Sequence, residues 1–178
     1  GEPAQELLRF ICGEVVRLFD LHLAWVGRKE ADGQVSIAAC GGNCVYAESL
    51  RTAGVRWDDA EGLGPIGAVL RSGQAQVFRV TDSAFRSWRD SAEQHGVRSV
   101  IVIPLITRGE IYGTFTLYST QPDRFDATAI VKHLTEIAGR ISVLVDMALD
   151  QQQLRLLSTA VTTAGTGVFI CDRSGRIQ

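Results

Sequence analysis

The fold of this chain is decided by four segments: EGLGPIG at residues 61–67, FRSWR at 85–89, GVRSVIVIPL at 96–105 and GTFTLYS at 113–119. The last two are short apolar runs joined by a polar turn, the pattern of a β-hairpin. The glycines of the first segment allow tight turns ahead of a helix, and FRSWR puts large side chains into a loop. The order predicts a sheet with an aromatic loop in front of it.

The composition is that of a soluble globular domain. A length of 178 residues favours one compact domain with an appendage, and 46% hydrophobic and 21% charged residues are ordinary proportions. The formal net charge of −2 gives no overall attraction to nucleic acid or to an anionic membrane. No apolar run is long enough to cross a bilayer, and no secretory signal pattern opens the chain. We therefore expect a cytoplasmic location and no nucleic-acid partner.

The four cysteines are Cys12, Cys40, Cys44 and Cys171. Cys12 falls on the face of an expected helix and Cys171 in an apolar run, where a thiol behaves as a small hydrophobic group. Cys40 and Cys44 form a C-x3-C pair with no second pair and no histidine nearby, so metal binding is not indicated. The favoured interpretation is unpaired, reduced thiols, and a redox-sensing Cys40–Cys44 pair is the alternative.

The N-terminal part predicts a helix followed by a hairpin. Apolar residues recur at helical spacing from Leu7 to His22, with Pro3 near the start. Residues 21–28 and 35–40 are apolar runs separated by EADG, and Asp-Gly favours a tight hairpin turn.

The middle of the chain predicts an excursion and then a second hairpin. The expected segments are a loop at 41–60 with a short helix at 46–51, a helix at 64–72, a strand at 76–80, a helix at 86–94, and strands at 99–106 and 110–119. Two hairpins without alternating βαβ units indicate an α+β fold with an antiparallel sheet and with the helices on one face.

Residues 125–157 predict one long helix. Its apolar residues follow the spacing of a coiled-coil seam: Ile130, Leu134, Ile137, Ile141, Leu144 and Ala148. At ~1.5 Å per residue such a helix is longer than a small domain needs, so we expect a connector that pairs with a second copy. Leu134, Ile137, Ile141, Leu144 and Ala148 are the expected dimer positions, with part of the face packing on the sheet instead.

The last twenty residues follow a different sequence pattern from the rest of the chain. TAVTTAGTGVFICDRSGRI at 159–177 has a glycine break, an apolar run and a D-x-x-G turn, and it resembles the opening hairpin of a PAS domain. The resemblance implies a linker at 151–160 and a truncated PAS-like start at 161–178. Because one hairpin does not fold alone, we expect the chain to be part of a longer protein.

The sequence gives little support for a catalytic site in this chain. His22, His95 and His133 fall on separate elements, and no G-x-S-x-G elbow or phosphate-binding loop is present. Gly62, Gly64 and Gly67 form a G-x-G-x-x-G string, but no βαβ unit surrounds it, so a dinucleotide fingerprint is rejected.

Residues 4–150 resemble a GAF sensory domain. The motifs that carry the resemblance are Trp57-x6-Gly64-Pro65-Ile66-Gly67, Phe85-x2-Trp88, Gly96-x-Arg98-Ser99 followed by Pro104-Leu105, and Gly113-x3-Leu117-Tyr118. The resemblance implies a GAF-like antiparallel sheet with the N- and C-terminal helices packed on one face and a long C-terminal connector helix. It also implies a ligand site between the sheet and the segments 46–57 and 85–99.

Large aromatic residues in irregular segments either plug the open edge of a core or form a pocket wall around a planar ligand. On the pocket hypothesis the candidate ligand-binding residues are Trp25, Tyr46, Trp57, Asp58, Phe85, Trp88, His95, Arg98, Ser99 and Ile101. Arg86, Arg89 and Arg98 would supply charge to an anionic ligand, although arginines at loop tips are usually solvated.

The cofactor is unknown from the sequence. Bilin-binding GAF domains attach their chromophore through a cysteine commonly followed by histidine, and no cysteine here has that neighbour. The cyclic-nucleotide signature N-K-x-n-F-x3-D-E is absent as well. A haem hypothesis rests on His95 alone, which lies near the position of the iron ligand in some GAF domains.

The function that the resemblance implies is sensing of a small molecule in a multidomain bacterial signalling protein, without catalysis by this segment. The implied architecture is GAF, PAS and a GGDEF or EAL output that makes or degrades cyclic-di-GMP, controlled through a dimeric helix. The alternatives are a histidine kinase output, a ligand-free dimerisation scaffold filled by Trp57, Phe85 and Trp88, and a methionine-sulfoxide reductase using Cys40 and Cys44.

Overall fold

The computed structural model describes residues 2–58 and 64–164. A six-stranded antiparallel sheet is built from β1 (Leu23–Lys29), β2 (Gln34–Gly42), β3 (Val55–Arg56), β4 (Gln76–Arg79), β5 (Ser99–Thr107) and β6 (Glu110–Ser119). The helices are α1 (Glu2–Phe19), α2 (Cys44–Ala53), α3 (Pro65–Ser72), the 3-10 turn η1 (Ser83–Phe85), α4 (Arg89–Gln94) and α5 (Thr128–Ala164). The strand order is β3-β2-β1-β6-β5-β4.

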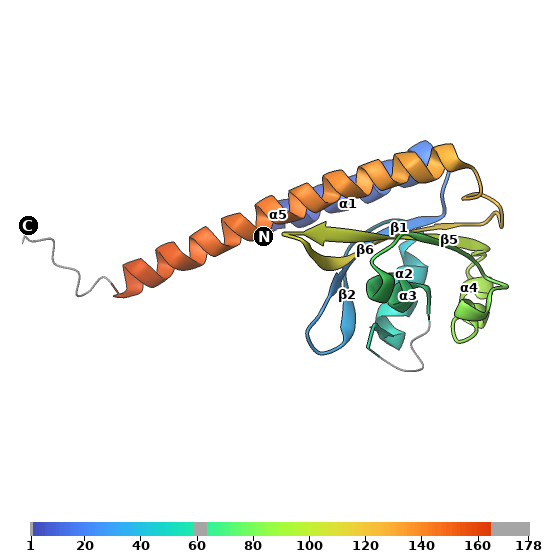
Figure 1. The fold of residues 1–178 in the computed structure, drawn as a ribbon, viewed down its shortest axis with the longest axis horizontal. Coiled ribbons are helices and arrows are strands. Elements are labelled where there is room, and N and C mark those ends of the chain that lie inside the picture. The colour runs from blue at the N-terminus through green and yellow to red at the C-terminus, as the bar shows by residue number, and fades with distance from the viewer. Residues whose placement is uncertain (1, 59–63, 165–178) are drawn as a thin grey trace, which may run out of the picture.

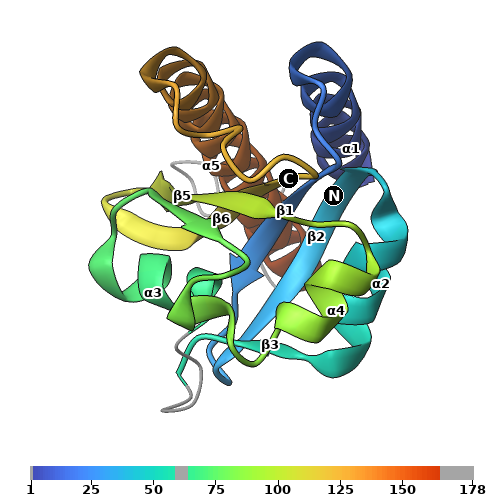
Figure 2. The ribbon, with the colours of Figure 1, turned by 90° about the vertical axis from the view of Figure 1, so that its right-hand side faces the viewer.

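The two terminal helices lie side by side on one face of the sheet, and α2, α3 and α4 lie on the other (Figures 1 and 2). The expected α+β class, with both terminal helices on one face, is confirmed. The expectation from the element order that all the helices share one face is wrong for α2, α3 and α4, because the sheet has a second apolar face that they cover.

The two hairpins form where the turn residues predict them. In the first, Glu30 donates its backbone N–H to the carbonyl of Gln34 at 2.9 Å. In the second, Arg108 and Gly109 both have positive φ, 53° and 79°, which is the backbone of a type I′ turn. β1 and β6 then pair at the centre of the sheet, with Trp25 opposite Thr116.

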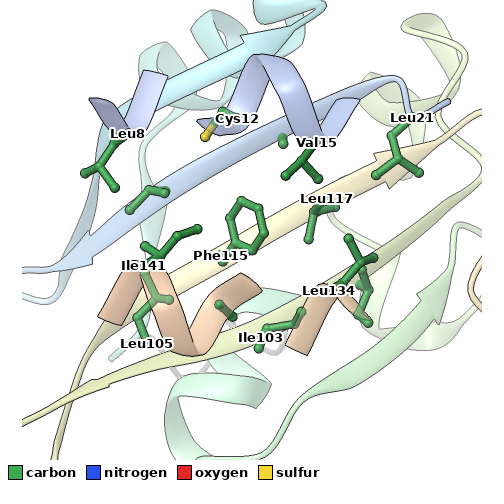
Figure 3. Packing of buried hydrophobic residues seen from close by; sticks show 14 of the residues in the cluster. Leu8, Cys12, Val15, Leu21, Ile103, Leu105, Phe115, Leu117, Leu134 and Ile141 are labelled. Carbon is green, nitrogen blue, oxygen red and sulfur yellow. The ribbon is translucent and has the colours of Figure 1, made fainter. Parts of the chain in front are cut away.

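Strand alternation gives the sheet two apolar faces. On β6, Phe115 and Leu117 face α1 and α5, whereas Thr116 and Tyr118 lie on the other side. Figure 3 shows Phe115 at the centre of the core under the terminal helices, with Leu8, Cys12 and Val15 from α1 and Leu134 and Ile141 from α5. A second core lies beneath α2, α3 and the α4 loop, around Trp25, Tyr46 and Phe85.

α1 packs very closely on β2. A Cβ on Gly41 would lie 2.3 Å from the backbone nitrogen of Gly13, so only glycine fits at position 41. This contact fixes the end of β2 just ahead of α2, which forms a wall of the site described below.

α5 begins at Thr128 and continues to Ala164, seven residues beyond the expected end. Its 37 residues span ~55 Å, and it leaves the domain in the direction seen in Figure 1. The residues that pack on the sheet are Ile130, Leu134, Ala138, Ile141 and Val145. Leu134 and Ile141, two of the expected dimer positions, are therefore buried in the domain's own core, and Ile137 packs against that core as well. Leu144 and Ala148 are half-buried.

Two expectations about the N-terminal part are corrected. The first helix ends at Phe19, so His22 lies between α1 and β1 and not on the helix. Cys40 and Cys44 form a disulfide across the β2–α2 turn, so the expectation of unpaired thiols is wrong for this pair. Cys12 is free, and its burial raises the pKa of its thiol to about 12.

The C-terminal expectations are tested only in part. Residues 151–160, the expected linker, continue α5 without a break, and so do residues 161–164. The rest of the PAS-like hairpin, with Cys171, lies outside the described residues. Within the described ranges, no helix combines the length and apolarity needed to cross a membrane.

Candidate functional site

A cavity of about 300 Å³ lies on the sheet face opposite α1 and α5. Its lining comes from β1 and β6, from α2 and β3, from the start of α3, and from η1 and the loop after it. The lining residues are Trp25, Tyr46, Leu50, Ala53, Gly54, Val55, Arg56, Gly64, Pro65, Ile66, Gly67, Phe85, Ser87, Trp88 and Tyr118.

The floor of the cavity is formed by Trp25 and Tyr118 on the two central strands. Trp25 lies flat along β1 because position 27 is glycine: a Cβ there would be 2.5 Å from Cζ3 of the indole ring. The six-membered ring of Trp25 therefore occupies the space over Gly27, and the opposite edge, with Nε1, faces away from Gly27.

Tyr46 on α2 forms the wall next to this floor. Its ring meets that of Tyr118 edge-on, with 5.3 Å between ring centroids, and it also contacts the ring of His95 at 4.9 Å. Burial raises the pKa of both tyrosine hydroxyls, to well above the ordinary value for Tyr118. Both therefore remain protonated and uncharged.

Nε1 of Trp25 is buried and has no hydrogen-bond partner in the described part of the chain. The Tyr118 hydroxyl lies beside the Trp25 indole, and this contact counteracts part of the rise in the pKa of Tyr118 that burial causes. Trp25 is 0% exposed, so its N–H lies beneath the floor of the cavity and not on its open surface.

Phe85 and Trp88 form the opposite wall, and Arg89 holds their loop in place. Its Nε donates to the carbonyl of Val80 at 2.9 Å, and Nη2 donates to the carbonyls of Thr81 and Asp82, each at 3.1 Å. The guanidinium of Arg89 therefore fixes the loop and does not supply charge to the cavity, contrary to expectation. Trp88 contacts Gly64, where a Cβ would lie 3.1 Å from Nε1 of Trp88.

The lining described by the structure carries one charged side chain, Arg56. Its guanidinium is bound by the carboxylate of Asp58, with Nη2 2.9 Å from Oδ1, and by the carbonyl of Asp32 at 3.0 Å. The charge is therefore compensated within the protein, and the cavity presents mainly aromatic and aliphatic surface.

Four of the ten sequence-predicted residues line the cavity: Trp25, Tyr46, Phe85 and Trp88. Trp57 and Asp58 lie just outside it. The indole of Trp57 donates to the carbonyl of Glu30 at 2.9 Å and stacks under the ammonium of Lys29, whose Nζ is 4.1 Å from the ring centroid. Asp58 is exposed and pairs with Arg56.

The other four predicted residues also lie elsewhere. His95 touches Tyr46 from outside the lining, and its Nδ1 is 2.7 Å from the carbonyl of Ser91. Arg98 is exposed at the start of β5. Ser99 donates to the carbonyl of Gln121 at 2.6 Å, and Ile101 belongs to the core under α1 and α5, on the far face of the sheet. Arg86 is exposed.

The sequence reasoning missed Tyr118, Leu50 and Ile66. Tyr118 could have been found from strand alternation, because it is one of the residues of β6 on the face away from Phe115 and Leu117. Leu50 follows Tyr46 by one helical turn, so a helix at 46–51 already placed both on one face.

The residues present do not fit haem ligation in this cavity, because His95 does not line it. Within residues 2–58 and 64–164, no cluster of His, Cys, Asp and Glu has the arrangement of a metal site. Cys40 in β2 and Cys44 at the start of α2 do not line the cavity either.

Comparisons with known proteins agree with this architecture. The family model described as GAF domain matches residues 1–146. No curated protein matches the chain. Similar solved structures include the GAF domain region of a protein from Geobacter sulfurreducens PCA, at 18% identity and a TM-score of 0.66, covering 82% of this chain and 94% of that one.

Two other similar structures come from proteins with different described functions. One is a domain of a protein described as a two-component sensor histidine kinase from Sinorhizobium meliloti 1021, with 19% identity, a TM-score of 0.65 and coverage of 84% and 95%. The other is type II free methionine-R-sulfoxide reductase from Thermoplasma acidophilum, with 17% identity, a TM-score of 0.64 and coverage of 81% and 92%. At such identities these structures support the fold only. The family model covers most of the chain, and the chain belongs to the GAF domain family.

Proposed function

We propose that this domain senses a small molecule in its aromatic cavity and passes the signal along α5 to the rest of a multidomain signalling protein. The observation that carries the proposal is the cavity itself. Five aromatic side chains from separate elements surround about 300 Å³ of open volume. Such a pocket, largely apolar with a few polar groups, has the character of a small-molecule site.

The same observation favours a sensor over a ligand-free scaffold. A scaffold would fill the pocket with Trp57, Phe85 and Trp88. In this structure Trp57 is outside the cavity with its indole N–H bound to Glu30, while Phe85 and Trp88 form a wall and leave the volume open.

The proposed dimer uses an outward stripe of α5, made of Val143, Met147, Leu154, Leu157 and Val161. These side chains are 55–67% exposed and follow the 4-3 spacing of a coiled-coil seam, with Asp150 at the one polar position. This stripe replaces the seam expected from the sequence, whose continuation beyond Ala148 is polar (Gln151, Arg155, Ser158 and Thr162). A second copy of α5 is the proposed occupant.

β6 offers a direct path from cavity to helix. Tyr118 belongs to the cavity floor, and the adjacent Leu117 packs under the terminal helices on the other face. A ligand that displaces Tyr118 therefore acts on the surface that supports α5. It would shift the population between two arrangements of the helix pair in proportion to its preference for one of them.

The output domain is proposed on sequence resemblance. The resemblance of residues 159–177 to the start of a PAS domain supports the proposal that a PAS domain follows α5, with a cyclic-di-GMP cyclase or phosphodiesterase as the proposed output. A histidine kinase output is the second candidate, supported by the similarity to the Sinorhizobium meliloti kinase domain. A reductase activity is not proposed, because Cys40 and Cys44 do not line the cavity.

Two neighbouring leucines test the dimer. Leu157 lies on the outward stripe and Leu156 lies off it, and both are well exposed, at 55% and 64%. In sedimentation equilibrium we expect the wild type and Leu156→Asp to be dimers and Leu157→Asp to be monomeric. A monomeric wild type, or equal behaviour of the two variants, would overturn the dimer.

Ligand occupancy is tested separately. Native mass spectrometry of freshly purified protein should find a bound molecule, or a fragment screen should find one if the protein is purified empty. Its binding should be abolished in Ala53→Trp, which puts a large side chain in place of a small lining residue. Binding that survives in Ala53→Trp would place the ligand elsewhere.

A further inference from the structure

Resting on the proposed sensor function, we propose that the Cys40–Cys44 disulfide is a redox switch that controls how firmly α2, one wall of the cavity, is held against the sheet. Reduction of the bond by a dithiol releases the start of α2, and reoxidation by a hydroperoxide fixes it again. The redox state of one cysteine pair thereby regulates the site that the sensor uses.

The disulfide joins a strand inside the sheet to the helix that forms the wall. Cys40 lies in β2, opposite Trp25 in the β1–β2 ladder, and Cys44 is the first residue of α2. The bond therefore acts directly on the part of the chain that walls the cavity. α2 and the residues after it contribute these lining residues: Tyr46, Leu50, Ala53, Gly54, Val55 and Arg56.

α2 is attached to β2 at both of its ends. The disulfide is the attachment at the start, and the pairing of β3 with β2, which sets Val55 opposite Val35, is the attachment at the end. Between the two, the hydroxyls of Ser49 and Thr52 donate to carbonyls of the helix itself. Reduction therefore leaves α2 tethered at its end and releases it at its start.

The reduced domain keeps its fold, because the bond lies at the margin of the second core. Cys40 and Cys44 are half-buried and pack against that core, whereas the apolar face of α2 is buried in it. The backbone N–H of Asn43 also donates to the carbonyl of His22 at 2.9 Å, independently of the disulfide. The expected change on reduction is thus a looser wall and not an unfolded domain.

Reduction proceeds by thiol–disulfide exchange. One thiolate of the dithiol attacks a sulfur atom of the pair and displaces the other cysteine as a thiolate. The second thiol of the reagent then displaces the protein from this mixed disulfide. The protein gains two electrons and two protons, and the dithiol is left as a disulfide.

Reoxidation needs a hydroperoxide and both cysteines. One cysteine thiolate takes an oxygen atom from the hydroperoxide and becomes a sulfenic acid, while the reagent leaves as water or an alcohol. The second cysteine then attacks the sulfenic sulfur, the oxygen leaves as water, and the S–S bond forms again.

The short loop limits the size of the effect. Cys40 and Cys44 are four residues apart, and closing so short a loop shifts the local equilibrium toward the attached helix by up to about thirtyfold. The apparent affinity of a ligand falls with the fraction of protein in the competent state. Reduction should therefore weaken binding in the cavity without abolishing it.

The three tyrosines of the chain report on the wall without any ligand. Tyr46 lies on α2, and its ring meets that of Tyr118 in the floor, whereas Tyr112 packs against the core under α1 and α5. In protein labelled with 3-fluorotyrosine, dithiothreitol should shift or broaden the ¹⁹F resonances of Tyr46 and Tyr118 and leave that of Tyr112 unchanged. Single Tyr→Phe variants assign the three resonances.

Hydrogen–deuterium exchange measures the size of the loosening. Amides of residues 48–53 in α2 should exchange about three- to thirtyfold faster in the reduced protein than in the oxidised protein. Amides of α3, which contributes to the same cavity but contains no cysteine, should exchange at the same rate in both states. Removal of dithiothreitol and addition of hydrogen peroxide should restore the slow exchange of α2.

Two variants separate the pair from the third described cysteine. Cys12→Ala keeps the disulfide and should respond to dithiothreitol as the wild type does, because Cys12 is a free, buried thiol. The double variant Cys40→Ser/Cys44→Ser should show the exchange of the reduced protein with or without dithiothreitol. If the double variant does not fold, the comparison of the oxidised and reduced wild type still decides.

The outcomes distinguish this inference from the sensor function. An unchanged Tyr46 resonance, or α2 exchange that is no faster after reduction, would overturn the redox switch and leave the sensor function to the Ala53→Trp test. Equal changes in all three tyrosine resonances would overturn it too, because reduction would then affect the whole domain. If the α2 response is present but no molecule enters the cavity in the fragment screen, the redox switch stands and small-molecule sensing is wrong.

Discussion

Arg108, at the tip of the β5–β6 hairpin, is paired with Asp146 on α5: its Nε lies 3.2 Å from Oδ1 of the carboxylate. The same guanidinium also binds Asp150, one helical turn later. The hairpin is thereby connected to α5 close to the point where the helix leaves the sheet, since Val145 is the last fully buried residue of α5. The backbone of Arg108 has a φ of 53°, so the side chain is carried by the tight turn itself.

Replacement of Arg108 by alanine should loosen α5 without unfolding the domain. The side chains of the pair are 48% and 38% exposed, so the unfolding free energy should fall by less than about 1 kcal/mol. Hydrogen–deuterium exchange of residues 146–154 should become faster. Arg79→Ala is the control, because Arg79 binds Asp126 at 2.6 Å near the other end of α5 and should leave this segment unchanged. Equal exchange in the two variants would assign no anchoring role to Arg108.

Gly27→Ala should destabilise the domain, because the new Cβ would lie 2.5 Å from Cζ3 of Trp25 and 2.9 Å from Cγ1 of Val35. Overpacking of this kind costs about 1–3 kcal/mol of unfolding free energy.

Gly139 on α5 is the opposite case, because a Cβ there has no neighbour within 4 Å. Gly139→Ala should therefore raise the unfolding free energy by about 0.5–1 kcal/mol through helix propensity. Urea unfolding measures both, and a Gly27→Ala variant as stable as the wild type would mean that the Trp25 ring can move freely.

The strands and turns could be predicted from the sequence because their local patterns agree with the final fold. The Asp-Gly and Arg-Gly turns fix both hairpins, and alternation then fixes the two faces of each strand. Ile101 shows where this reasoning stops. Residues 100–106 of β5 are all apolar, so the sequence of this strand does not reveal which of Ile101 and Val102 lies on the cavity side of the sheet. The structure places Val102 in the core on the cavity side of the sheet, although not in the cavity lining.

The roles of single polar residues could not be predicted, because they depend on contacts distant in sequence. The sequence suggests that Arg89 is available to a ligand, whereas in the structure its guanidinium donates to the backbone carbonyls of residues 80–82. Cys40 and Cys44 looked unpaired because a C-x3-C spacing does not show whether the two sulfur atoms face each other. In the structure the end of β2, where Gly42 has a φ of 86°, and the first residue of α2 bring the two sulfur atoms together.

Loss of the Cys40–Cys44 disulfide should destabilise the start of α2. No side chain caps this helix end, so the disulfide is a substantial part of its attachment. Closing so short a loop contributes roughly 2 kcal/mol in the chain-entropy estimate. Cys44→Ser should therefore unfold at lower urea, and dithiothreitol should lower the stability of the wild type but not of Cys44→Ser.

Alkylation gives an internal control for that experiment. After reduction of the native protein, iodoacetamide should label Cys40 and Cys44 but not Cys12, which is 0% exposed and whose pKa is raised to about 12 by burial. Labelling of Cys12 at a similar rate would indicate that reduction unfolds the domain and does not act on α2 alone.

His22 should make the domain less stable in mild acid. Desolvation lowers the pKa of His22 below 6.5, and Asn43 Nδ2 lies 3.2 Å from Nε2, a contact that suits an unprotonated nitrogen. Because the folded state has the lower pKa, the unfolded chain binds a proton first as the pH falls. The stabilisation from neutral His22 is thus complete above pH 6.5 and is lost as the pH drops through the folded-state pKa.

The melting temperature of His22→Gln should decline less steeply below pH 6.5 than that of the wild type. The control is His133→Gln, altered at an exposed position on α5, which should match the wild-type slope. Parallel slopes for all three proteins would remove His22 as the source of acid sensitivity.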